Sequence, residues 1–308
     1  MPWRETPQQL ERARAERPLV VPAPDGALFG ILTPPDPAVP PAGLCAVLFT
    51  RPRSHRDRMF VELARELACR GFAAFRFDYH GTGDSGGTSG FLDPDQPYRA
   101  DAVAVLRHLR AGHGQRRFVL VGSCFDARTA LSAFADEAAA IEALAFVAAP
   151  CMALDTQVKA HADHKDWRHL LRALRNPENW RGLARAERWR HMTSVFSRVA
   201  GRSLAGEGGE LPLAPSFMEH FGALARSRAR ALFLYGIADQ EYATFQVAER
   251  TLLARLDAAT RARFEVVLWP GHVHGFLEVD RQRETLAKLL DWIGALPAAR
   301  GSGSTAEA

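Results

Sequence analysis

The sequence lacks three features that would place it in a specialised class of protein. Its four cysteines lie far apart, with no C-x-x-C pair and no histidine spacing typical of a metal site. No apolar run approaches the roughly 18 residues of a membrane-spanning helix. The segment from Met1 to Pro18 is polar and charged and has no apolar core of a secretory signal. These absences predict a cytoplasmic protein with no membrane span, no resident metal and no cofactor.

The chain also has little excess charge. Its net charge of +4 is carried mainly by arginine, and the basic residues are spread along expected helices without interleaved aromatic residues. We therefore expect no nucleic-acid partner. The 47% of hydrophobic residues in 308 suit a soluble globular protein, either one large domain or one domain with an insertion.

Short apolar runs alternate with helical patterns along most of the chain. After an N-terminal stretch expected to be disordered, Leu19–Ala23 and Ala27–Leu32 predict an antiparallel hairpin. Buried strands are then predicted at Cys45–Phe49, Phe72–Phe77, Phe118–Val121, Ile141–Ala148, Ala229–Tyr235 and Phe264–Leu268. Strands that alternate with helices predict an α/β fold, with a mostly parallel sheet flanked by helices on both faces.

Two segments depart from this alternation. Residues 151–226 carry helical patterns rich in arginine and tryptophan, and we expect them to form a helical lid. Residues 300–308 are small and polar, which is typical of a disordered tail. The α/β core is thus predicted to comprise residues 1–150 and 227–299.

The strand that begins at Phe118 leads into a motif typical of a catalytic nucleophile. Gly122-Ser123-Cys124-Phe125-Asp126 lies between a strand and a helix, as in the G-x-nucleophile-x-G elbow. Cys124 holds the nucleophile position, and Asp126 replaces the second glycine. A tight turn would raise the thiol above the sheet edge, and the helix N-terminus would favour the thiolate. The alternative is a buried cysteine at an ordinary strand–helix junction.

Two further motifs follow later strands. Asp239 comes just after the strand that ends at Tyr235, and His272 and His274 come just after the last strand. Because the carboxyl ends of parallel strands meet at one edge of a sheet, we expect these residues to gather near Cys124. The chain order is nucleophile, acid, histidine.

These motifs resemble those of the α/β-hydrolase superfamily, and the resemblance extends from about Leu19 to Leu296. The segment Arg76–Ser85 is similar to the R-F-D-x-x-G-x-G-x-S loop of serine-aminopeptidase-like members. It also resembles hydrolases and acyltransferases from exopolysaccharide and natural-product gene clusters. Y-G-x-x-D, ending at Asp239, and H-G-F, beginning at His274, are similar to the family's acid and histidine segments. A cysteine nucleophile occurs in a minority of the superfamily, the dienelactone hydrolases among them.

The resemblance implies a role for each motif. Cys124 would attack an acyl carbon, His274 would act as general base, and Asp239 would orient the imidazole. We prefer His274 to His272 because it directly precedes Gly-Phe. Asp239 could instead cap the helix that follows it.

The oxyanion is expected to be stabilised by two backbone N–H groups, those of Phe125 and Arg51, since Pro52 has no N–H to donate. Three other residues could contact the substrate: Ser123, Asp126 and His272. For Asp126 we favour a structural role, because a carboxylate suits the first turn of a helix. As an alternative, Asp126 could raise the pKa of Cys124 by charge repulsion.

The resemblance implies an acyl-transfer enzyme, a thioesterase or acyltransferase, that forms a Cys124 acyl thioester in a biosynthetic pathway. Its expected partner is a small-molecule acyl substrate bound to CoA or a carrier protein, and we expect a monomer or homodimer. The tryptophans of the expected lid could cover an acyl pocket, and its arginines could attract a carrier protein. The alternative is that the arginines form a solvated helix face and the tryptophans belong to the core. Two other functions stay open: an ester or lactone hydrolase of the dienelactone-hydrolase type, and a catalytically degenerate scaffold.

Overall fold

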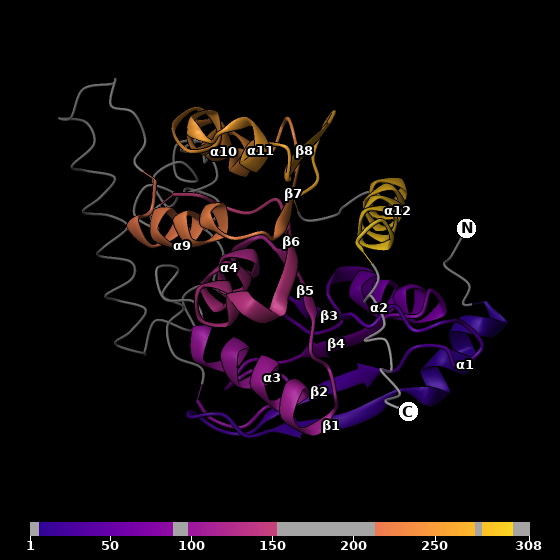
Figure 1. Cartoon of the computed structure of the whole chain (residues 1–308). Helices are drawn as coiled ribbons and strands as arrows, with labels where there is room; N and C mark the ends of the chain where they lie inside the picture. The colour runs from indigo at the N-terminus through magenta and orange to yellow at the C-terminus, as the bar shows by residue number, and fades with distance from the viewer. Residues whose placement is uncertain (1–5, 89–97, 153–212, 275–278, 298–308) are drawn as a thin grey trace, which may run out of the picture. The chain divides into compact units, whose positions relative to one another are not determined.

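The structure is a computed structural model that describes residues 6–88, 98–152, 213–274 and 279–297 (Figure 1). The chain divides into two compact units, one formed by residues 1–151 with 213–308 and the other by residues 152–212. Most of the lid expected at residues 151–226, and the whole tail at 300–308, lie outside the described residues. The larger unit holds every element discussed below.

The larger unit is built on a sheet of eight strands in the order β1-β2-β4-β3-β5-β6-β7-β8. The first two pairs, β1–β2 and β2–β4, are antiparallel, and all later pairs are parallel. The mostly parallel sheet predicted from the alternation of strands and helices is confirmed. The strands are β1 (Arg17–Val21), β2 (Leu28–Thr33), β3 (Cys45–Phe49), β4 (Ala73–Phe77), β5 (Phe118–Ser123), β6 (Ile141–Val147), β7 (Arg230–Gly236) and β8 (Phe264–Trp269).

Helices pack on both sides of this sheet (Figure 1). Helix α2 (Met59–Cys69) packs against β4, with α1 (Pro7–Ala15) and α12 (Val279–Gly294) beside it. Helix α4 (Phe125–Glu137) packs against β5 and β6, with α3 (Arg99–Gly112) and α9 (Pro215–Arg226) beside it. The other helical segments in the described ranges are α10 (Gln240–Thr251), α11 (Ala258–Arg261) and short 3₁₀ turns at Arg56–Arg58, Ala138–Ala140 and Leu253–Arg255.

The core explains why the strands are apolar without interruption. In β5, Val119 and Val121 belong to the hydrophobic cluster that includes Leu63 of α2 and Leu289 of α12. The alternate residue Leu120 faces the other way and is equally buried. A strand covered on both faces loses the alternation of polar and apolar residues. In the described part of the chain, no helix is long and apolar enough to cross a bilayer.

The N-terminal stretch differs from the prediction of disorder, because residues 7–15 form α1. The helix is held through tertiary ion pairs that a local pattern does not reveal. Glu16, just after the helix, accepts hydrogen bonds from Arg65 at 3.0 Å and from Arg76 at 2.9 Å. Both arginines are nearly buried, so their charges need this partner.

Candidate active site

The turn between β5 and α4 raises Cys124 out of the sheet. Cys124 has φ 54° and ψ −131°, and its N–H donates to the carbonyl of Val147 at 2.8 Å. A residue other than glycine in such a conformation is strained by about 1–3 kcal/mol, and strain of this kind clusters at active sites. Cys124 is partly exposed, whereas Ser123 is the last residue of β5 and is buried. The structure thus places the thiol, and not the neighbouring hydroxyl, on the turn.

Gly122 makes this turn possible because α4 passes directly over it. A Cβ atom at Gly122 would lie 2.3 Å from the Cα atom of Ala127. Gly122→Ala is therefore expected to push α4 away from β5 and to destabilise the fold by about 1–3 kcal/mol. Chemical denaturation measures this change in the free energy of unfolding. Gly112→Ala is the matched control, since a Cβ there meets nothing within 4 Å. Equal stability of the two variants would contradict the close approach.

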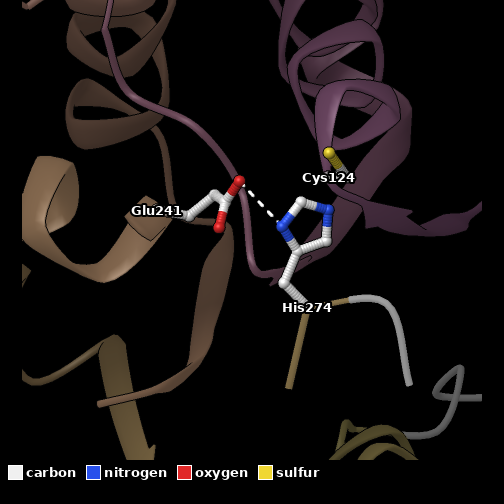
Figure 2. Close-up of side chains that lie close together, drawn as sticks. All are labelled: Cys124, Glu241 and His274. Atoms are coloured by element: carbon white, nitrogen blue, oxygen red, sulfur yellow. Dashed lines mark ion pairs between the residues drawn. The ribbon is translucent and has the colours of Figure 1, made fainter. Parts of the chain in front are cut away.

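His274 links Cys124 to an acidic residue that the sequence analysis did not single out. Its Nδ1 atom lies 2.8 Å from Oε1 of Glu241, which is itself buried. Figure 2 shows Glu241 on one side of the ring and Cys124 on the other. The thiol, imidazole and carboxylate atoms all lie within 4.8 Å of one another. The three side chains therefore form a continuous thiol–imidazole–carboxylate chain.

Asp239, expected to orient the imidazole, makes a different set of contacts. Its fully buried carboxylate accepts hydrogen bonds from the backbone N–H groups of Gly236 (3.0 Å), Val273 (3.0 Å) and His274 (3.0 Å). The ring of His274 is bonded to Glu241 instead. Asp239 thus holds the loop that carries the histidine, and Glu241 makes the contact with the imidazole that was expected of Asp239. Glu241 lies in the first turn of α10, where acidic residues are common. Its position in the sequence therefore gave no sign that it would contact the histidine.

The other loop histidine is placed less favourably. Nδ1 of His272 lies 3.2 Å from Oδ1 of Asp239, and the side chain is 68% exposed. His274 is 38% exposed and faces Cys124. This arrangement favours His274 over His272 as the base.

Hydrogen bonds with Cys124 and then with Glu241 raise the pKa of His274 to about 10. The imidazole therefore stays protonated well above neutral pH and can stabilise a thiolate. We expect the rate at which iodoacetamide alkylates Cys124 at pH 7 to depend on His274, because the protonated ring lies beside the thiol. His274→Gln should lower this rate by about tenfold or more, because the variant removes the cationic ring that stabilises a thiolate.

Peptide mapping by mass spectrometry measures this rate at each cysteine separately. Cys69 is an internal control, because it is partly exposed but its pKa is raised by burial. Its alkylation should be slow at pH 7 and unaffected by His274→Gln. Equal reactivity of Cys124 and Cys69 in the wild-type protein would contradict an activated thiol.

Asp126, at the position of the usual glycine, is buried and forms an ion pair with the partly exposed Arg51. Its Oδ1 accepts a hydrogen bond from Nε of Arg51 at 3.0 Å. Burial raises the pKa of Asp126 to about 6, while the charge and hydrogen bond of Arg51 act against this increase. The fully buried Tyr79 lies nearby, and its pKa is raised by burial and by the negative charge of Asp126. The carboxylate therefore serves to hold Arg51 beside the elbow.

The two residues expected to donate to the oxyanion, Phe125 and Arg51, follow neighbouring parallel strands. Phe125 is the first residue of α4, and the first N–H groups of a helix have no acceptor within the helix. Arg51 follows β3, which pairs in parallel with β5, so that Phe49 lies opposite Gly122. Arg51 lies two residues beyond Phe49, and Cys124 lies two residues beyond Gly122.

Ser123 contacts a histidine from the same loop as Arg51. Its hydroxyl lies 3.2 Å from Nε2 of His55, whose ring stacks on Phe60. Burial is the main reason that the pKa of His55 falls to about 4. This partly buried imidazole, bonded to the buried hydroxyl of Ser123, positions the loop after β3 against the elbow.

Among the residues that the structure describes, two groups carry the ligand types that metals prefer. Cys124, His274 and Glu241 form the first, and Asp25, His80 and Asp101 form the second. In the first group Nδ1 of His274 is already bonded to Glu241, which leaves Nε2 as the ring's remaining ligand atom. In the second, both Nδ1 and the backbone N–H of His80 are bonded to Asp101. The contacts of the first group match a nucleophile, its base and an orienting acid.

Comparisons with known proteins agree with this architecture. Residues 46–189 match the family model described as serine aminopeptidase, S33. An α/β serine hydrolase homologue from Coxiella burnetii is 17% identical, with a TM-score of 0.54 over 90% of this chain and 97% of its own. A Pyrococcus furiosus esterase is 12% identical, with a TM-score of 0.58 over 96% and 95% of the two chains. Est1E from Butyrivibrio proteoclasticus, solved with ferulic acid, is 14% identical, with a TM-score of 0.53 over 89% and 97%. No curated protein sequence matches the chain. The predicted α/β-hydrolase fold of the core is thereby confirmed, and most of the expected lid lies outside the described residues.

Proposed function

We propose that the chain, whose residues 46–189 match the family model described as serine aminopeptidase, S33, is an acyl-transfer enzyme, a thioesterase or acyltransferase, with Cys124 as nucleophile. The observation that carries the proposal is the chain of contacts from Cys124 through His274 to Glu241. The proposal departs from the sequence-based expectation in one residue, because Glu241 replaces Asp239 as the partner of the imidazole.

The proposed reaction has two halves. The Cys124 thiolate attacks the acyl carbon, and the N–H groups of Phe125 and Arg51 stabilise the oxyanion. The tetrahedral intermediate collapses, its bond to the leaving group breaks, and His274 gives its proton to that group. His274 then takes a proton from water or from an acceptor alcohol or amine, which attacks the acyl thioester and releases Cys124.

Glu241 supports both proton transfers through the imidazole. Its carboxylate stabilises the charged ring and keeps the proton on Nδ1, so that Nε2 exchanges the reacting proton. Asp239 acts one step further away, by fixing the backbone of the loop that carries His274. In this proposal the nucleophile, the base and the oxyanion donors are all residues of the described site.

A panel of matched donors tests this proposal and separates the possible products. Each acyl group is offered as an oxyester and as a thioester, with and without a primary amine or an alcohol, and the products are separated by chromatography. Transfer predicts an amide or a new ester, and a thioesterase or ester hydrolase predicts free acid only. A preference for oxyesters or lactones would favour the dienelactone-hydrolase type. No reaction with any donor would contradict the proposal and leave a binding or scaffold protein.

A further inference from the structure

The side chain of Arg51 is fixed beside the nucleophile by two contacts. Its Nε donates to Oδ1 of Asp126 at 3.0 Å, and its Cζ lies 5.6 Å from the centre of the Tyr98 ring. Asp126 is two residues past Cys124 in the same helical turn. The guanidinium is thus held one hydrogen bond away from the elbow.

These contacts leave one edge of the guanidinium available. Among the described residues, the hydrogen bonds of the Arg51 side chain involve only Nε, and the side chain is 30% exposed. The terminal edge, formed by Nη1 and Nη2, carries paired donors whose spacing matches the two oxygens of a carboxylate. A purely structural pair with Asp126 would be stronger if it were bidentate, which it is not.

The order of the strands indicates which part of a donor would lie at Arg51. Arg51 follows β3, on one side of β5, whereas Glu241 and His274 follow β7 and β8 on the other side. His274 must reach the leaving group to protonate it. The acyl chain is then directed toward β3 and Arg51.

We infer that the Arg51 side chain binds a carboxylate carried by the acyl chain, so that the preferred donors are carboxyacyl esters or thioesters. The inference rests on the proposed acyl-transfer function and specifies its substrate class. Asp126 is a positioning residue here, because it holds Nε and leaves the terminal edge to the substrate. Tyr98 limits the movement of the guanidinium plane.

A pair of thioesters that differ in one charge tests the inference. N-acetylcysteamine thioesters of glutarate and of its neutral monomethyl ester are compared by kcat/KM. The wild-type enzyme should prefer the glutaryl donor, and Arg51→Gln should lower the ratio of the two kcat/KM values by about 10- to 100-fold. The ratio of the two kcat/KM values is compared because the backbone N–H of Arg51 is also a proposed oxyanion donor. A change at this donor would affect both thioesters equally and would cancel in the ratio.

Arg53→Gln is the matched control for charge and position. Arg53 lies two residues further along the same loop, but its guanidinium is bonded to Asp78 and Asp84. The ratio should stay near the wild-type value in this variant. An unchanged ratio in Arg51→Gln, or an equal fall in both variants, would overturn the inference.

Alkylation tests whether Arg51 attracts a carboxylate near Cys124, without any acyl chemistry. Iodoacetate and iodoacetamide differ only in carrying a carboxylate or an amide next to the reacting carbon. The ratio of their rates at Cys124 should fall about tenfold in Arg51→Gln and stay constant in Arg53→Gln. If no donor reacts, the proposed function fails and this ratio alone decides the inference. If donors react but neither ratio depends on Arg51, the proposed function stands and the inference is wrong.

Discussion

Glu241→Gln is expected to lower kcat by a factor on the order of 10² to 10⁴ while leaving the fold intact. Glutamine keeps the size of the side chain but cannot stabilise the imidazolium, because it has no negative charge. The hydrogen bond with Glu241 also helps to raise the pKa of His274, so this pKa should fall toward its ordinary value of about 6.5 in the variant. Steady-state kinetics and NMR titration of the His274 ring measure the two effects.

Asp239→Asn is the comparison that separates the two acids. Its carboxylate holds three backbone N–H groups and has no contact with the His274 ring in the structure. We expect this variant to lose stability, by about 1–3 kcal/mol, and to change the pKa of His274 less than Glu241→Gln does. The reverse result, with Glu241→Gln nearly silent and Asp239→Asn lowering the pKa of His274, would assign the orienting role to Asp239.

Cys124→Ser is expected to lower kcat/KM by a factor on the order of 10³ or more, and Cys124→Ala should remove the reaction. A serine hydroxyl is far less acidic than a thiol, so His274 would have to deprotonate it during the attack and could not pair with a preformed anion. Initial rates with the best donor of the matched panel measure this loss.

Ser123→Ala is the matched control, because it alters the neighbouring hydroxyl and leaves the thiol in place. The variant loses the contact with His55 and should retain at least about a tenth of the activity. Full loss of activity in Ser123→Ala together with an active Cys124→Ala would show that the nucleophile had been assigned to the wrong neighbour.

Much of the fold could be predicted because the central strands are buried on both faces. β3 was predicted with its observed bounds, and β5, β6 and β8 begin at the predicted residue. A continuous apolar run marks such strands directly. Helix α1 could not be predicted in this way, because its stability comes from Glu16 pairing with arginines distant in sequence.

The candidate site could be predicted only in part, and for a related reason. The positions of Cys124, Asp239 and His274 follow from motifs at the ends of strands, which local sequence encodes. Which carboxylate meets the imidazole depends on how the loop around His274 turns, and three backbone N–H groups already occupy Asp239. Glu241, only two residues away, then reaches the ring. Tertiary geometry thus determines which carboxylate contacts the imidazole, and no local sequence motif indicates it.

The central claim, that Cys124 carries the acyl group, is tested most directly by trapping the intermediate. The enzyme is mixed with an excess of a reactive thioester, quenched in acid within the first turnover, digested and analysed by mass spectrometry. We predict one acyl group on the peptide that contains Cys124, removed by neutral hydroxylamine as a thioester is, and absent from Cys124→Ala. An acyl group that resists hydroxylamine, or turnover with no acyl group on Cys124, would contradict this account.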